Sequence, residues 1–136
     1  MNSVNASVVY FDDFLVYFAL ALLILVVFSW LYMKITPYRE LDLIRSGNTA
    51  AAITLSGAMI GFTLPLASVV ANSVNLVDML LFAVLAGLVQ MIVFIVGRKL
   101  LPGLPDSIED GNIAKATLIA AMSVCVGLLN AAALTY

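Results

Sequence analysis

Two identical dipeptides with the polar groups needed to bind a small ligand occur 64 residues apart, Gly47-Asn48 and Gly111-Asn112. Each lies where an apolar run begins. An asparagine oxygen, together with the free N–H groups of a helix start, can hold an ion or a small polar ligand. The same pair is also typical of helix caps, because Asn accepts a backbone bond and Gly permits an unusual turn. Capping is the commoner role, and ligand binding is kept as the alternative.

Two amide side chains lie inside apolar runs, Gln90 near the middle of one and Asn130 nearer the end of another. An amide in hydrocarbon needs a partner on another helix, within the chain or across an oligomer. The sequence therefore favours an interhelical hydrogen bond at each position over a transport site.

Enzyme chemistry has little support in this sequence. Histidine is absent, so a catalytic serine has no histidine base, and one cysteine without histidine makes no zinc-type ligand set. Cys125 lies in an apolar run, where a thiolate is costly. The acids of the charged segments, such as Asp42 and Asp106, are the remaining candidates for catalysis and more simply offset nearby cations. We expect no enzyme, no cofactor and no metal.

The composition excludes a free soluble domain. The 136 residues are 64% hydrophobic and 10% charged, whereas soluble domains are roughly half apolar and a quarter charged. A chain of this length has too little interior to bury so much apolar surface. The net charge of −2 offers no basic surface for nucleic acid.

Four runs without charge predict the helices that must position these side chains, at residues 14–33, 49–77, 79–97 and 116–136. Each is long enough for the roughly 20 helical residues that cross a bilayer. Helices are expected because hydrocarbon leaves backbone groups no other partners. We predict an all-α integral membrane protein, a single domain over residues 1–136, with helices near 13–35, 47–71, 77–100 and 111–134.

The cations fix the predicted orientation. All six lie in or beside the first and third connections, namely Lys34, Arg39, Arg45, Arg98, Lys99 and Lys115. By the positive-inside rule these connections are cytoplasmic and both termini lie outside. The basic loops also attract anionic headgroups and form a candidate contact surface for a cytoplasmic protein.

The chain also contains an internal repeat. With an offset of 64 residues, the pattern D-x-I-x-x-G-N-x-A-x-A occurs at 42–52 and again at 106–116. We predict two tandem repeats of two helices, at approximately 12–71 and 76–135. An even number of helices gives the two copies the same direction, so the repeats are parallel. Parallel repeats lower the expectation of an alternating-access transporter.

Small residues predict the main helix contact. Gly57 and Gly61 form a G-x-x-x-G pattern, which lets helix backbones approach closely in lipid. We expect the second and fourth spans to form the central contact, with the first and third outside. Pro65 is expected to kink the second span. A pore-lining or gating role for these residues is the alternative.

The stretch E-L-D-L-I-R-S-G-N-T-A-A-A at residues 40–52, with I-E-D-G-N-I-A-K-A at 108–116, resembles the YjfL-like bacterial inner-membrane proteins, the domain of unknown function 350 family. The resemblance covers essentially the whole chain. It implies a duplicated four-helix protein of the bacterial cytoplasmic membrane and no particular activity. In the second copy Ala121, Cys125 and Leu129 replace Gly57, Gly61 and Pro65, so any role of those three belongs to the first half.

Two functions are carried forward. The first is a non-enzymatic scaffold or envelope-stress partner that acts with cytoplasmic proteins through the basic loops. It is motivated by the lack of any ionisable side chain in the predicted spans, since such groups usually mark proton relays and ion-coupled transport. The alternative is a small oligomeric channel or facilitator for ions or small solutes. A four-helix bundle has side chains rather than water at its centre, so passage of a solute would need an oligomer. We therefore expect a homo-oligomer.

Overall fold

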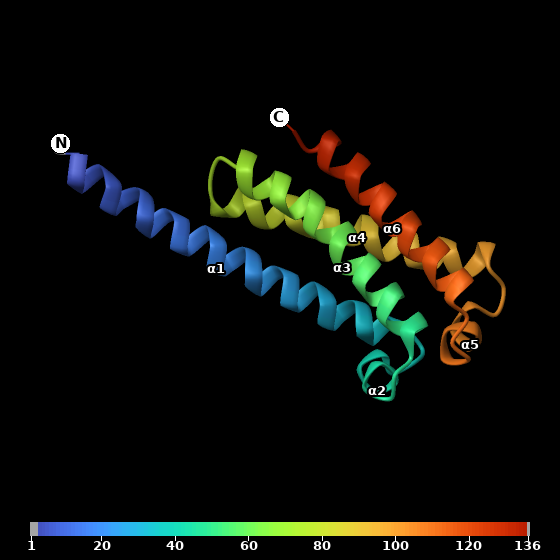
Figure 1. Ribbon diagram of the computed structural model, residues 1–136. Coiled ribbons are helices and arrows are strands. Elements are labelled where there is room, and N and C mark those ends of the chain that lie inside the picture. Colours follow the sequence, from blue (N-terminus) through green and yellow to red (C-terminus); the bar gives the residue numbers. More distant parts are fainter. Residues whose placement is uncertain (1–2, 136) are drawn as a thin grey trace.

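The computed structural model describes residues 3–135, and every regular element in that range is a helix (Figure 1). The order is α1 Ser3–Ile35, α2 Glu40–Arg45, α3 Thr49–Asn72, α4 Leu76–Leu100, α5 Leu104–Glu109 and α6 Ile113–Ala133. Two six-residue helices, α2 and α5, lie in the first and third connections. The predicted all-helical fold is confirmed.

The four long helices α1, α3, α4 and α6 are all long and apolar enough to cross a membrane. Even α6, with 21 residues, extends about 31 Å, close to the thickness of a hydrocarbon core. The predicted start of the first helix was wrong, since α1 begins at Ser3 instead of near residue 13. Asp12 and Asp13 suggested a boundary, but no Gly or Pro interrupts residues 3–35, so the helix continues through both acids.

The two connections that contain α2 and α5 have the same local geometry. Gly47 and Gly111 follow the short helices with φ of 92° and 82°, a left-handed conformation that favours glycine. The residue after each glycine makes the same backbone hydrogen bond in both connections. The Asn48 N–H donates to Leu43 O and the Asn112 N–H donates to Ser107 O, both at 2.8 Å. The arrangement of the two whole halves as tandem parallel repeats stays a prediction.

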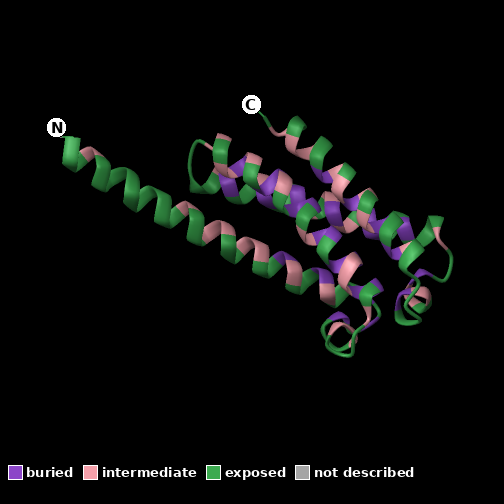
Figure 2. Cartoon of the chain, viewed as in Figure 1, coloured by how far each residue is buried: buried purple, intermediate pink, exposed green. Residues whose placement is uncertain are grey.

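The central contact of the bundle is between α3 and α6, as the small residues predicted. A Cβ atom at Gly57 would lie 2.5 Å from Ala120 Cα, and one at Gly127 only 2.1 Å from Gly61 O. The two backbones therefore touch directly. Buried residues concentrate around this contact, whereas the beginning of α1 is exposed and diverges from the other helices (Figure 2).

Pro65 lies inside α3 and is fully buried. The helix continues through it, and the kink expected there stays a prediction. Proline has no backbone N–H, so Gly61 O, four residues earlier, has no helical donor. This carbonyl must find its partner on another helix.

Candidate functional site

Gln90 provides that partner. Its side chain is 2% exposed, and Nε2 donates to Gly61 O at 3.0 Å and to Ser123 O at 3.2 Å. The predicted interhelical bond is confirmed, and it joins α4 to both α3 and α6. The other amide atom, Oε1, is buried and has no hydrogen-bond partner within residues 3–135. Gln90 therefore holds the bundle together at the carbonyl that Pro65 leaves free.

Within residues 3–135 the interhelical bond expected of Asn130 is not observed, and a bond to a second copy of the chain stays a prediction. The Asn130 Nδ2 atom is buried and has no hydrogen-bond partner in the described part of the chain. At that level Ser68 connects α3 to α6 instead, because its hydroxyl donates to Ala131 O at 2.9 Å. The sequence pattern could not distinguish between two polar side chains that are both near the end of the contact.

The two Gly-Asn pairs act as helix caps. Asn48 Oδ1 accepts from Ala51 N at 2.9 Å, and Asn112 Oδ1 accepts from Lys115 N at 3.1 Å. Asn48 makes a further connection, since its Nδ2 donates to Ile108 O and Glu109 O at 2.9 and 3.1 Å. This side chain therefore ties the start of α3 to the end of α5.

The structure brings the two Gly-Asn turns together. A polar hollow of about 370 Å³ lies between them, lined by Gly47 and Asn48 on one side and by Glu109, Asp110 and Gly111 on the other. Asn112 is exposed and does not line it. Both asparagine oxygens accept the capping bonds just described. Ligand binding by the pairs stays a prediction.

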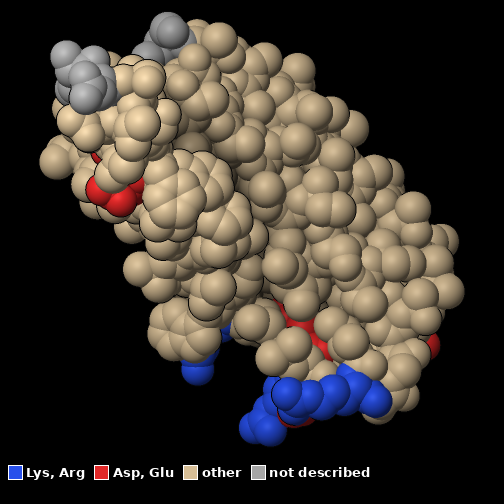
Figure 3. Space-filling model, turned by 60° about the vertical axis from the view of Figure 1, so that its left-hand side comes forward, with Lys and Arg blue, Asp and Glu red and all other residues tan. Residues whose placement is uncertain are grey.

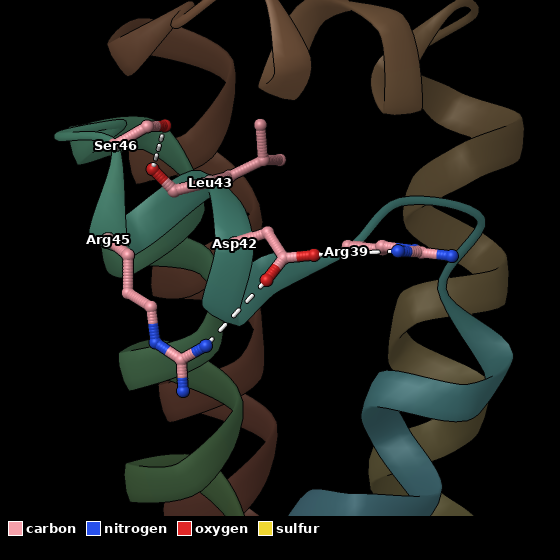
Figure 4. A network of polar contacts seen from close by, with 5 residues as sticks. All are labelled: Arg39, Asp42, Leu43, Arg45 and Ser46. Carbon is pink, nitrogen blue, oxygen red and sulfur yellow. Dashed lines mark hydrogen bonds and ion pairs between the residues drawn. The ribbon is translucent and has the colours of Figure 1, made fainter.

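All six cations lie near α2 and α5, at what we call the basic end: Lys34, Arg39, Arg45, Arg98, Lys99 and Lys115. Figure 3 shows blue side chains gathered at the lower end of the molecule, below a wide uncharged surface. Asp42 lies between Arg39 and Arg45, 3.7 Å from each (Figure 4). The arginine side chains are 89% and 76% exposed, and such surface pairs are worth only about 0–1 kcal/mol. Both guanidinium groups therefore remain accessible to a partner.

A polar site that the sequence did not predict lies beside α2. Glu40 is 2% exposed, and its carboxylate accepts a hydrogen bond from the Thr36 hydroxyl. Burial raises the pKa of Glu40, and the Thr36 bond opposes that shift. The nearby Tyr38 hydroxyl is buried without a hydrogen-bond partner in residues 3–135, and burial, followed by the charge of Glu40, raises its pKa.

These residues are among the lining of a depression of about 430 Å³, which we call the interfacial hollow. Its lining comprises Trp30, Met33, Lys34 and residues 36–42. The only hint in the sequence was the four-residue spacing of Thr36 and Glu40. Nothing in the charge pattern separated the buried Glu40 from Asp42, whose side chain is 58% exposed.

A further depression lies along α1, towards the middle of the bundle. This α1–α4 groove, of about 420 Å³, lies between α1 and α4 from Leu20 to Leu31, with Phe28 and Phe62 among its lining residues. Phe28 and Phe62 stack with ring centroids 4.0 Å apart, which joins α1 to α3. Every side chain that lines the groove is apolar.

Helices of this length and hydropathy, with charge only in their connections and in their terminal parts, define a multi-pass integral membrane protein. The chain belongs to the family described as Domain of Unknown Function (DUF350), which matches residues 3–134. It is 32% identical over 123 residues to the UPF0719 inner membrane protein YjfL of Escherichia coli strain K12. The aligned region covers 90% of this chain and 93% of that relative. The protein of the same name from Escherichia coli O157:H7 has the same identity and coverage. No solved structure matches the chain. The resemblance found in the sequence is thus confirmed.

Proposed function

We propose that this protein is a non-enzymatic scaffold of the bacterial inner membrane, whose basic end binds an acidic surface of a cytoplasmic protein. The observation that carries the proposal is the exposure of cations from both halves of the chain at one end of the molecule. The printed name of the Escherichia coli relative supports the inner-membrane location. The positive-inside rule supports a cytoplasmic basic end, with both termini outside.

The connections between the helices support a fixed docking surface. Asn48 bonds the α2–α3 turn to the last carbonyls of α5, and the Lys115 ammonium donates to Ser107 at 3.0 Å. These bonds fix the positions of the basic residues of the two connections relative to one another. A surface that is ordered before binding loses less entropy when a partner docks.

The interior favours a scaffold over the channel alternative. Gly57, Gly61 and Gly127 bring α3 and α6 into direct backbone contact, so no solute can pass between these two helices. The depressions that follow the long helices, at α1–α4 and around Ile53 and Val124, have largely apolar linings. Such surfaces suit lipid or helix contacts better than a hydrated path.

The test is quantitative co-purification of the tagged full chain from its own bacterium in mild detergent. We expect specific cytoplasmic proteins to be enriched, and expect Arg39→Gln with Arg45→Gln to reduce them. The matched control is Asp12→Asn with Asp13→Asn, which also removes two exposed charges, but from the far part of α1. Equal recovery with both double variants, or recovery of the chain without any enriched protein, would refute the proposal.

The predicted homo-oligomer is part of the same proposal, since a scaffold gains avidity when several docking surfaces are presented together. The mass of the detergent-extracted assembly, determined by light scattering, tests it. We expect a mass of two or more chains, and a single chain would remove the oligomer from the proposal.

A further inference from the structure

The interfacial hollow and the α1–α4 groove follow one another along α1. The groove ends at Leu31, and the hollow begins with Trp30 and Lys34. Lys34 lies three residues after Leu31 and seven after Val27, so it continues the helix face that lines the groove. The polar depression therefore lies beside the end of the apolar groove that is nearer the basic end.

The groove has the length of one lipid leaflet. From Leu20 to Leu31 it extends about 16 Å at 1.5 Å per residue. Half of a hydrocarbon core about 30 Å thick is about 15 Å. A lipid chain that starts at the basic end would therefore fill the groove and end near the middle of the bilayer.

The hollow lies at the depth of a headgroup. Trp30 is 55% exposed, and tryptophan is enriched where the membrane meets water. The Lys34 ammonium lies 5.3 Å from the centre of its ring. Two cations and two carboxylates line the hollow, namely Lys34, Arg39, Glu40 and Asp42. This formal balance favours a headgroup that carries one charge of each sign.

Glu40 indicates where the positive charge of that headgroup would lie. It is buried, accepts a bond from Thr36 and has no ion pair among residues 3–135. A buried carboxylate is costly unless a cation and hydrogen bonds compensate for its lost hydration. A primary ammonium supplies both the charge and three N–H donors, whereas a quaternary ammonium supplies the charge alone.

We propose that the groove and the hollow together bind one phospholipid with a zwitterionic, primary-amine headgroup of the phosphoethanolamine type. One acyl chain occupies the α1–α4 groove. Lys34 binds the phosphate, and Glu40 accepts hydrogen bonds from the ammonium. This inference goes beyond the scaffold and does not depend on it, because no protein partner takes part.

The test is native mass spectrometry of the delipidated full chain with three lipids that share the same acyl chains. Their headgroups are phosphoethanolamine, phosphocholine and phosphoglycerol. We expect the phosphoethanolamine lipid to be retained about tenfold more strongly than the phosphocholine lipid, because only the primary ammonium donates charge-assisted hydrogen bonds to Glu40. Soluble O-phosphoethanolamine, which lacks the chains, should not displace it. Equal retention of all three lipids, preference for phosphoglycerol, or displacement by the soluble compound would overturn the proposal.

Variants separate the headgroup contacts from general effects of charge. Lys34→Gln and Glu40→Gln should each reduce retention of the phosphoethanolamine lipid about tenfold. Their matched controls, Lys99→Gln and Asp106→Asn, lie outside the hollow and should leave retention unchanged. Glu40→Gln keeps the shape of the side chain, and its melting temperature shows whether the fold is intact. Equal effects of the variants and their controls would overturn the assignment.

A third variant tests the groove. A Cβ at Gly87 would lie 3.6 Å from Phe62 and 3.7 Å from Phe28, which is ordinary contact. Gly87→Leu therefore places its additional atoms in the groove, and we expect loss of the lipid from a folded protein. If this variant instead converts a dimer to a monomer and leaves lipid retention unchanged, the groove binds a second copy of the chain and the proposal is wrong.

Discussion

Replacing Gln90 by methionine tests whether Pro65 and Gln90 act as a pair. The substitution keeps the side-chain volume but removes both donors to α3 and α6. Gly61 O would then have no donor, since Pro65 has no N–H, and leaving a buried carbonyl unsatisfied costs about 1–3 kcal/mol. Loss of the Ser123 bond adds about 0.6 kcal/mol, and removal of the unpartnered Oε1 returns about 1 kcal/mol. We expect a net loss of stability of about 2 kcal/mol.

The diagnostic measurement is a double-mutant cycle with Pro65→Ala. Alanine restores the N–H that bonds to Gly61 O within α3, so Gln90→Met should be milder by about 1–2 kcal/mol in that background. Unfolding in mixed micelles containing dodecyl sulfate, followed by circular dichroism, gives the four free energies. Asn72→Leu serves as the control, because the Asn72 amide bonds within α3 to Ser68. If Gln90→Met is equally destabilising with proline and with alanine at position 65, the reasoning is refuted.

Three further predictions use the same unfolding assay or thermal melting in detergent. Gly127→Ala should destabilise the protein by about 1–3 kcal/mol, because its Cβ would overlap Gly61 O. Gly87→Ala is the control and should change stability by at most about 1 kcal/mol. Equal effects of the two variants would contradict the backbone contact between α3 and α6. Asn48→Ala should lower the free energy of unfolding by about 2–3 kcal/mol, because it removes one helix cap and two further side-chain bonds, whereas Asn112→Ala removes only a cap and should lower it by about 1 kcal/mol. Identical losses would exclude the tie to α5. The raised pKa of Glu40 means that the native state binds its proton more tightly, so wild-type stability should fall as pH rises from 4.5 through the raised pKa. This decrease of stability with pH should be smaller in Glu40→Gln. Parallel pH profiles of the two proteins would show that Glu40 is not responsible.

The long elements were predictable because hydrocarbon leaves a backbone few choices. Charge-free runs near the length of a bilayer crossing had to be helices, and Gly57 and Gly61 had to lie where backbones meet. The beginning of α1 was placed wrongly because two adjacent acids suggested an aqueous boundary. Residues 3–35 contain neither Gly nor Pro, and the helix continues through Asp12 and Asp13.

The polar sites were only partly predictable, because they depend on distances between elements that are remote in sequence. That Gln90 needs a partner follows from its position in an apolar run. That its partner is Gly61 follows from Pro65, and this link requires the register of α4 against α3. Glu40 was missed because burial of a loop carboxylate depends on how α2 folds against the end of α1, and a charge pattern contains no such information.

The carbonyl that Pro65 leaves free has a consequence for the insertion of the chain into the membrane. An isolated α3 in lipid carries an unsatisfied acceptor at Gly61, and an isolated α4 carries an unsatisfied amide at Gln90. These two helices are consecutive and joined by the short segment 73–75, so a hairpin that leaves the insertion machinery as one unit satisfies both groups at once. Helix α6 then joins a hairpin in which Gly61 O already has its donor, and α1, held mainly by its last turns, is the helix whose late arrival disturbs the assembly least.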